Sequence, residues 1–293
     1  MHVSLQCKVI NHAYVFRKFL YRHCEDILSQ PNYFKFTLSE FNLSIYIMKR
    51  KYPSVSKATE AERIVMVKNI FGTVTGKYDF LNHFLSLRRD VAWRRFTVRR
   101  MRFFKTNHFL DVACGTGDLA IEAVSVYPHI HVAGLDFVGE MIELACLKIK
   151  KGQLSKNVSL IKGDALTLPF VSSSFDVVGT AFGIRNIPDR MQALREMTRV
   201  VVPGGQVMVL EMVSPHHTLL RGIYRIYLSK ILPRLARLLS SNPAAYHYLA
   251  DSIINFPPPD VFCGVMEEAC LTEVKAYPLS LGITYLFIGI KPK

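Results

Sequence analysis

From Lys105 to the C-terminus, short apolar runs alternate with longer stretches whose apolar residues recur at helical spacing. This alternation constrains the fold more than any other feature, because it is typical of a mostly parallel sheet with helices on both faces. Strands are predicted at residues 108–113, 131–135, 158–161, 175–180 and 206–211, with helices at 119–126, 140–151 and 190–200. Two further strands, at 273–277 and 284–290, complete a seven-stranded, Rossmann-like α/β sheet whose last strand is expected to be antiparallel.

Residues 1–55 differ in character from residues 56–293, which predicts an N-terminal extension followed by one domain. Charged residues interrupt the apolar positions of the extension, so neither a membrane span nor a secretory signal fits there. The extension is either an organelle transit peptide, although Glu25, Asp26 and Glu40 interrupt it, or sequence upstream of a true start at Met48. Within the domain, residues 212–271 are too long for an ordinary crossover and are predicted to form an insertion on the substrate side.

Two local patterns add detail to this outline. Pro203-Gly204-Gly205 predicts a turn that ends the third helix and leads into the fifth strand, because Pro cannot continue a helix and Gly tolerates positive φ. Residues 60–71 are predicted to form a helix that packs on the domain through Ile64, Val67, Ile70 and Phe71.

The net charge of +14 and a pI near 9.6 favour an anionic partner, whether a nucleic acid, a phosphorylated substrate or a membrane surface. The six cysteines show no CxxC pair and no zinc-type spacing with His, so neither a metal site nor a disulfide framework is expected.

The clearest candidate site is the segment Asp111-Val112-Ala113-Cys114-Gly115-Thr116-Gly117-Asp118, which follows the first predicted strand. Gly115 and Gly117 allow a tight turn and close approach of a ligand, as at other nucleotide-binding turns, although a plain strand-to-helix turn would use the same residues. A dinucleotide site needs a third Gly, which is absent, and the Asp118 carboxylate is expected to repel phosphate. S-adenosylmethionine carries a sulfonium, an ammonium and a carboxylate but no phosphate, so this acidic turn favours it, with Asp111 suited to the ammonium.

Two more acids follow the next two predicted strands. Asp136 lies at the end of the second strand, where a carboxylate can accept hydrogen bonds from both ribose hydroxyls, and Asp164-Ala165 after the third strand could contact the adenine edge. Each acid alone could equally cap a helix or a turn. Their order along the chain favours a ligand site, because the carboxyl ends of neighbouring strands in an open α/β sheet are where ligands bind.

From about Val65 to the C-terminus the chain resembles the C-methyltransferases of menaquinone and ubiquinone biosynthesis. The resemblance rests on residues 76–82 (GKYDFLN), 111–119, 163–170, 182–186 (FGIRN), 195–205 and 246–253 (YHYLADSI). It implies that Thr116, Asp136, Asp164 and Ala165 contact the cofactor, and that Tyr78 and Asp79 form part of a lid. The family has a Ser before Phe-Gly where this chain has Ala181, so only a backbone contact is expected there.

The resemblance implies a quinol ring carbon as the methyl acceptor, most simply that of demethylmenaquinol, with a ubiquinone-pathway benzoquinol as the alternative. Such a carbon becomes nucleophilic when a neighbouring hydroxyl, of pKa about 10, is deprotonated. Arg185 is predicted to stabilise the phenolate and Asn186 to orient it, whereas the competing interpretation of Arg185 is a surface or helix-capping residue. Tyr246, Tyr248 and Ser252 fit a substrate pocket and an ordinary core equally well, and His247 is expected to be exposed.

Two interpretations from other classes stay open, an RNA methyltransferase and a noncatalytic cofactor-binding partner protein. No nucleic acid partner is expected, because Thr180-Ala181-Phe182-Gly183 stands where amine methylases of nucleic acids often carry an Asn/Asp-Pro-Pro-aromatic segment. The acceptors of the family that the chain resembles carry isoprenoid tails, so the enzyme is expected to meet a membrane. Residues 219–239 mix Leu, Ile and Tyr with Arg and Lys. They are predicted either to lie on an anionic membrane surface or to form ordinary, partly buried helices that are broken at Pro233. A homodimer is also expected, in the cytoplasm, or in the mitochondrial matrix if the N-terminus is a transit peptide.

Overall fold

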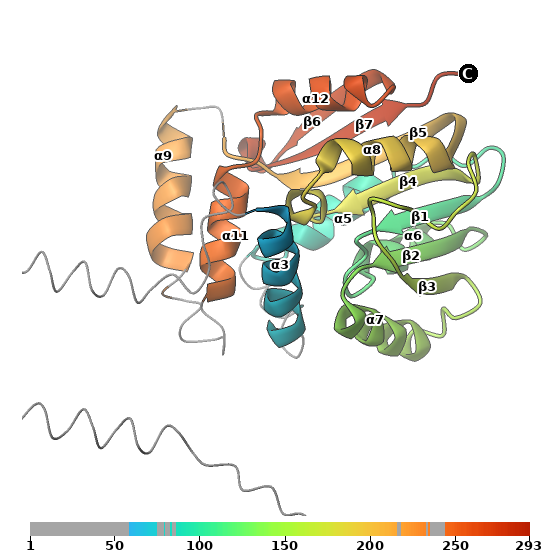
Figure 1. The fold of residues 1–293 in the computed structure, drawn as a ribbon, viewed down its shortest axis with the longest axis horizontal. Coiled ribbons are helices and arrows are strands. Elements are labelled where there is room, and N and C mark those ends of the chain that lie inside the picture. The colour runs from blue at the N-terminus through green and yellow to red at the C-terminus, as the bar shows by residue number, and fades with distance from the viewer. Residues whose placement is uncertain are drawn as a thin grey trace, which may run out of the picture. The chain divides into compact units, whose positions relative to one another are not determined.

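The computed structural model describes residues 59–74, 79, 83, 86–215, 218–232, 234 and 244–293. Its seven strands form a single sheet in the order β3-β2-β1-β4-β5-β7-β6 (Figure 1). The strands are β1 (His108–Val112), β2 (His131–Asp136), β3 (Val158–Lys162), β4 (Phe175–Ala181), β5 (Val201–Met212), β6 (Thr272–Leu279) and β7 (Thr284–Ile290). Strand β7 is antiparallel to both of its neighbours, while β1 to β5 are parallel, which confirms the predicted Rossmann-like α/β sheet.

Helices cover both faces of the sheet. Helices α5 (Arg89–Val98), α6 (Asp118–Val126) and α7 (Gly139–Lys151) share one core with β1, and the residues of this core include Trp93, Leu119 and Ile149. Helices α8 (Arg190–Val200) and α12 (Pro259–Glu268) form the core on the opposite face, around Leu194, Met197 and Phe262. Both cores are continuous apolar layers, as expected for strands that are buried on two sides.

A third apolar cluster joins α3 (Glu60–Val74), α9 (Thr218–Ile226) and α11 (Ala244–Ile254), which stand together at one end of the sheet in Figure 1. A short π-helix, Tyr227–Ile231, continues α9. Thr59 and Glu62 begin α3 with reciprocal hydrogen bonds between side chain and backbone, which is the capping-box arrangement. The helix expected at 60–71 therefore forms and extends to Val74, with Ile70 buried in the cluster while Ile64 is exposed.

The predicted turn at Pro203-Gly204-Gly205 lies inside a strand, because α8 ends at Val200 and β5 already begins at Val201. The register of β5 against β4 jumps from Phe175↔Val201 to Val177↔Gln206, so the Pro-Gly-Gly residues form a bulge rather than the start of the strand. Gly204 has φ of 77°, and a Cβ on Gly205 would lie 2.7 Å from the carbonyl oxygen of Asp176. The glycines are needed for this bulge, and the extended backbone of Val201 ends the helix.

The segment between β5 and β6 divides into two parts. Helix α11 packs on α3 and on the π-helix that continues α9, whereas α12 packs on β6, β7 and α8 as an ordinary crossover helix. None of the helices in the described part of the chain is long and apolar enough to span a bilayer.

Candidate active site

A cavity of about 810 Å³ lies at the carboxyl ends of β1, β2 and β4. Its walls come from the strand ends, including Asp111 and Asp136, and from the helical cluster, including Tyr224 and Ile253. The strand order changes direction between β1 and β4, and such switch points are where open α/β sheets bind ligands. The volume is in the range of small-molecule sites.

The glycine turn after β1 forms the floor of this cavity. Gly115 and Gly117 have φ of 55° and 81°, and a Cβ added to Gly115 would meet nothing within 4 Å. The Gly115 amide donates to Oδ2 of Asp136 over 2.7 Å, and the Val138 amide donates to Oδ1 over 2.9 Å. Burial raises the pKa of Asp136, although these two hydrogen bonds and one from the Phe137 amide act in the opposite direction. Each carboxylate oxygen still has acceptor capacity for a ligand hydroxyl.

Asp111 is the most unusual group in the turn. The residue is almost completely buried, and its Oδ2 atom has no hydrogen-bond partner among the described residues. Burial raises its pKa to about 8, while a hydrogen bond from the Ala120 amide and the charge of Arg94 act in the opposite direction. A buried acceptor without a partner is rare in folded proteins and points to a missing cationic or donor ligand.

An ionic cluster covers the other side of the turn. The Lys148 ammonium contacts Asp118, lies 2.8 Å from Oδ2 of Asp79 and donates to the Thr116 hydroxyl over 3.2 Å. The Thr116 hydroxyl in turn donates to Oδ1 of Asp79 over 2.7 Å. Burial raises the pKa of Asp118, but the charges of Arg94 and Lys148 outweigh it and hold that pKa below its ordinary value. Asp118 is therefore an ionised carboxylate paired with two cations, and its expected repulsion of phosphate stays a prediction.

The remaining cofactor residues predicted from sequence also line the cavity. Asp164 is exposed and accepts a hydrogen bond from the Leu166 amide over 2.9 Å, so it caps its own turn as well as facing the cavity. Ala165 is buried beside it, and Ala181 ends β4 on the opposite wall. The structure thus brings together all eight predicted cofactor residues: Asp111, Gly115, Thr116, Gly117, Asp136, Asp164, Ala165 and Ala181.

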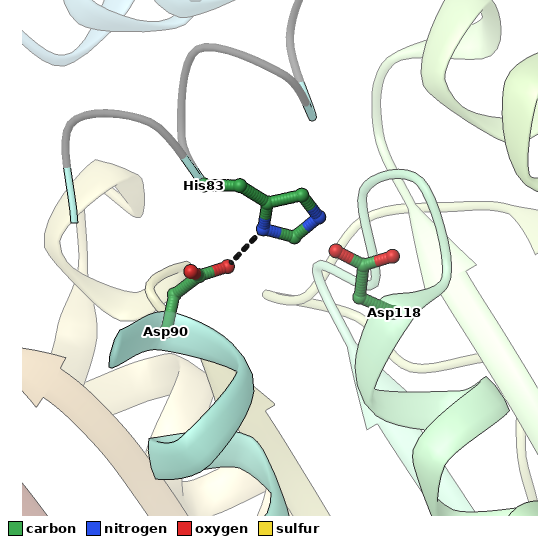
Figure 2. Close-up of side chains that lie close together, drawn as sticks. All are labelled: His83, Asp90 and Asp118. Carbon is green, nitrogen blue, oxygen red and sulfur yellow. Dashed lines mark hydrogen bonds and ion pairs between the residues drawn. The ribbon is translucent and has the colours of Figure 1, made fainter. Parts of the chain in front are cut away.

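Figure 2 shows a group that sequence reasoning missed, with the His83 ring between the carboxylates of Asp90 and Asp118. Nδ1 of His83 lies 2.7 Å from Oδ2 of Asp90, the Ser86 hydroxyl donates to Oδ1 of Asp90, and Arg94 donates to Oδ2. Three such ligands could in principle hold a metal ion, but Arg94 and Lys148 already neutralise both carboxylates. The arrangement is an ion-pair network, and no sequence pattern indicated it because its members meet only in the fold.

On the acceptor side, Arg185 and Glu211 form a buried ion pair. Nη1 of Arg185 lies 2.5 Å from Oε1 of Glu211, and the Arg185 backbone amide donates to Oε2 over 3.2 Å. Glu211 is fully buried and Arg185 nearly so, which makes the alternative of a surface or capping Arg185 wrong. Sequence reasoning missed Glu211, although a charge in the apolar run Val207-Met208-Val209-Leu210-Glu211 was a visible signal.

Asn186 is held by the insertion, because the Tyr248 hydroxyl donates to its Oδ1 over 3.0 Å. Tyr246, Tyr248 and Ser252 are buried in or beside the helical cluster and do not line the cavity, which favours their core interpretation. His247 is half-buried rather than exposed. Tyr78 and Pro233 lie outside the described residues.

A model of the ubiE/COQ5 methyltransferase family matches residues 56–291. The chain belongs to this family. The chain is 38% identical to the ubiquinone/menaquinone biosynthesis C-methyltransferase UbiE of Geotalea daltonii, over 77% of this chain and 96% of that protein. It is 39% identical to the demethylmenaquinone methyltransferase of Deinococcus radiodurans, over 77% of this chain and 92% of that protein.

Two solved structures share the fold of this ubiE/COQ5 family member. A SAM-dependent methyltransferase from Thermotoga maritima superposes with a TM-score of 0.53 at 19% identity, covering 76% of this chain and 99% of that one. The phosphoethanolamine N-methyltransferase 2 of Haemonchus contortus, in complex with S-adenosyl-L-methionine, superposes with a TM-score of 0.53 at 15% identity, covering 73% and 56%. At such identities the likeness concerns the fold alone.

Proposed function

We propose that this chain transfers a methyl group from S-adenosylmethionine to a ring carbon of demethylmenaquinol. The observation that carries the proposal is that one cavity joins a turn with a buried, unpartnered Asp111 oxygen to an apolar chamber under α9 and α11. Relatives that share 35–39% identity with the chain are named for this reaction, or for the ubiquinone and menaquinone C-methylations together.

The groups around the turn fit S-adenosylmethionine. Asp111 receives the ammonium, since its Oδ2 atom lacks a partner, and Asp136 receives the ribose hydroxyls. The Asp164-Ala165 turn faces the adenine edge, while Ala181 offers only its backbone. When bound, S-adenosylmethionine supplies an electrophilic methyl group on a sulfonium.

The acceptor chamber holds the quinol in near-attack geometry, which is the main task of a methyltransferase. Its walls are apolar and include the buried residues Leu228, Leu232 and Ile253, so they exclude water from the ring and accommodate the start of an isoprenoid tail. Glu211 fixes the Arg185 guanidinium and shares its charge, so Arg185 acts as an oriented hydrogen-bond donor to the developing phenolate oxygen rather than as an isolated cation. Asn186, held by Tyr248, orients the same hydroxyl, and Tyr78 stays a predicted member of the lid.

Incubation with labelled S-adenosylmethionine and a short-tail demethylmenaquinol tests the reaction, with the demethoxy benzoquinol analogue in parallel. We expect the label in the naphthoquinol. Label in the benzoquinol alone would show that the chain catalyses the ubiquinone-pathway methylation instead, which is the alternative that the names of the UbiE relatives allow. No label in either quinol, despite measurable cofactor binding, would contradict the proposal and favour a noncatalytic role.

Contact with a membrane surface completes the proposal, because the acceptor is a lipid. Leu219, Ile223 and Ile226 are exposed along one stripe of α9, and Leu87 and Leu281, more than 80% exposed, line the same cavity. Two exposed arginines, Arg221 and Arg225, lie round the other side of α9 from this stripe, so the helix has an apolar face and a basic face, as amphipathic helices at anionic interfaces do.

Sedimentation with vesicles that contain anionic lipid tests this contact. The double variant Arg221→Glu/Arg225→Glu should lose binding, whereas Lys150→Glu/Lys151→Glu, an equal charge change on exposed positions of α7, should not. Equal loss of vesicle binding in both variants would show that net charge alone causes the binding and would contradict a contact through α9. No loss of binding in the α9 variant would contradict the contact as well. A homodimer, the domain boundary near residue 56 and a location at the inner face of the membrane stay predictions.

A further inference from the structure

The cofactor's amino acid end carries a carboxylate as well as an ammonium, and a buried carboxylate needs a cationic partner. The described residues that line the cavity include three cations, Arg89, Arg94 and Arg185. Arg89 is exposed, and Arg185 is paired with Glu211 on the acceptor side. Arg94 is largely buried, with 12% of its side chain exposed, and it lies among the acids of the glycine turn.

The position of Arg94 relative to Asp111 is the decisive point. Arg94 and Asp111 line the same cavity, and Nη2 of Arg94 lies 3.5 Å from Oδ2 of Asp118 in the glycine turn. The charge of Arg94 also lowers the pKa of Asp111. An ammonium and a carboxylate attached to one carbon require receptors that are close neighbours. If Asp111 receives the ammonium, Arg94 is the cation placed to receive the carboxylate.

The surroundings of Arg94 hold it ready for this contact. Nη1 donates to Asp90 over 2.7 Å, and the buried Asp90 carboxylate also accepts a hydrogen bond from the Ser86 hydroxyl. On a further side Asp90 is paired with His83, as Figure 2 shows. The Phe182 ring lies 5.5 Å from the guanidinium carbon. The second acidic contact, Nη2 to Asp118 at 3.5 Å, is long for a hydrogen bond and easily exchanged. A guanidinium has five N–H donors, so donors remain for a ligand carboxylate.

We infer that Arg94, anchored by Asp90, is the receptor for the carboxylate of S-adenosylmethionine. Asp90 is a positioning residue, with Ser86 and His83 behind it, and the ligand carboxylate takes over the Nη2 side that faces Asp118. The inference rests on the proposed cofactor.

The test compares the dissociation constants of S-adenosylmethionine and decarboxylated S-adenosylmethionine, measured by calorimetry. The wild-type protein should prefer the carboxylate-bearing ligand. Arg94→Gln should lose roughly 30-fold or more in affinity for S-adenosylmethionine, the loss expected when a buried charged partner is removed. The decarboxylated ligand should lose much less, because for it the variant removes only the effect of the Arg94 charge on the ionisation of Asp111. The affinity of Arg94→Lys for S-adenosylmethionine should lie between those of the wild type and Arg94→Gln, because an ammonium lacks the planar set of donors that lets a guanidinium bind Asp90 and the ligand together.

The matched control is Arg95→Gln, on the same helix, where the arginine is half exposed and paired with Glu122. It should keep the wild-type preference. An Arg94→Gln protein that still prefers the carboxylate, or that loses affinity equally for both ligands, would overturn the inference and leave the backbone amides at the start of α6 as receptors. A wild-type protein that binds both ligands equally would overturn it without any variant, while one that binds neither would contradict the proposed cofactor instead.

Discussion

The buried Asp111 carboxyl makes the cofactor-free protein less stable than it could be, and Asp111→Asn should reveal this. In the unfolded chain an Asp ionises with a pKa near 3.8, whereas burial raises the pKa of Asp111 in the folded protein to about 8. Between these values the unfolded state binds fewer protons than the folded state, so the stability of the fold falls as pH rises. At pH 7 the accumulated cost is about 4 kcal/mol, from roughly 1.4 kcal/mol for each of about three pH units.

A neutral amide of similar shape avoids this cost. In the absence of cofactor, Asp111→Asn should therefore melt at a higher temperature than the wild type at pH 7, by roughly 8–16 °C at 2–4 °C per kcal/mol. The difference should shrink steadily as the pH is lowered from 7 towards 4. Differential scanning calorimetry over that pH range measures it.

Cofactor binding should reverse the order of stability. The ammonium next to Asp111 favours the ionised carboxylate, so binding to the wild type at pH 7 should release about one proton, and affinity should rise with pH up to about 8. Calorimetry in two buffers of different ionisation enthalpy detects that proton, and Asp111→Asn should release none. A cofactor-free variant less stable than the wild type, or a melting difference that does not change with pH, would refute the reasoning.

Three further predictions concern the rest of the chain. Arg185→Lys keeps the charge beside Glu211 but loses the oriented fork, so turnover should fall roughly 100-fold in steady-state assays while the cofactor dissociation constant stays unchanged; normal turnover would contradict the assigned role. Asp176 is fully buried, and its carboxylate accepts backbone hydrogen bonds from the loop at 104–107 outside the cavity, so Asp176→Ala should lower the free energy of unfolding by about 3 kcal/mol and the melting temperature by roughly 10 °C, with activity of the folded fraction retained. A Cβ on Gly183 would lie 2.6 Å from the Thr180 hydroxyl oxygen and 2.8 Å from the Ala113 Cβ, so Gly183→Ala should destabilise the fold by about 1–3 kcal/mol in urea denaturation, whereas Gly264→Ala, with open space at its Cβ, should not.

Local sequence patterns were sufficient for most elements of the sheet. The strand at 284–290 and the helix at 190–200 form at the predicted residues, because a period of two or of 3.6 residues is a property of the segment itself. Pro203-Gly204-Gly205 was misinterpreted because a turn and a strand bulge use the same residue types, and only pairing with β4 and β7 distinguishes them.

The sequence by itself determined that a glycine turn and two acids follow successive strands, and strand ends of a parallel sheet necessarily meet at one edge. It also carried the motifs on which family membership rests. Only the tertiary structure decided the electrostatic state of each group, since that depends on burial and on partners far along the chain. Asp111 is left without a partner at Oδ2, Asp118 is neutralised by Lys148 thirty residues away, and Arg185, in the short helix after β4, is paired with Glu211 in β5. A charged residue can be identified in the sequence, but its pKa and its ion pairs depend on the groups that the fold places within a few ångströms of it.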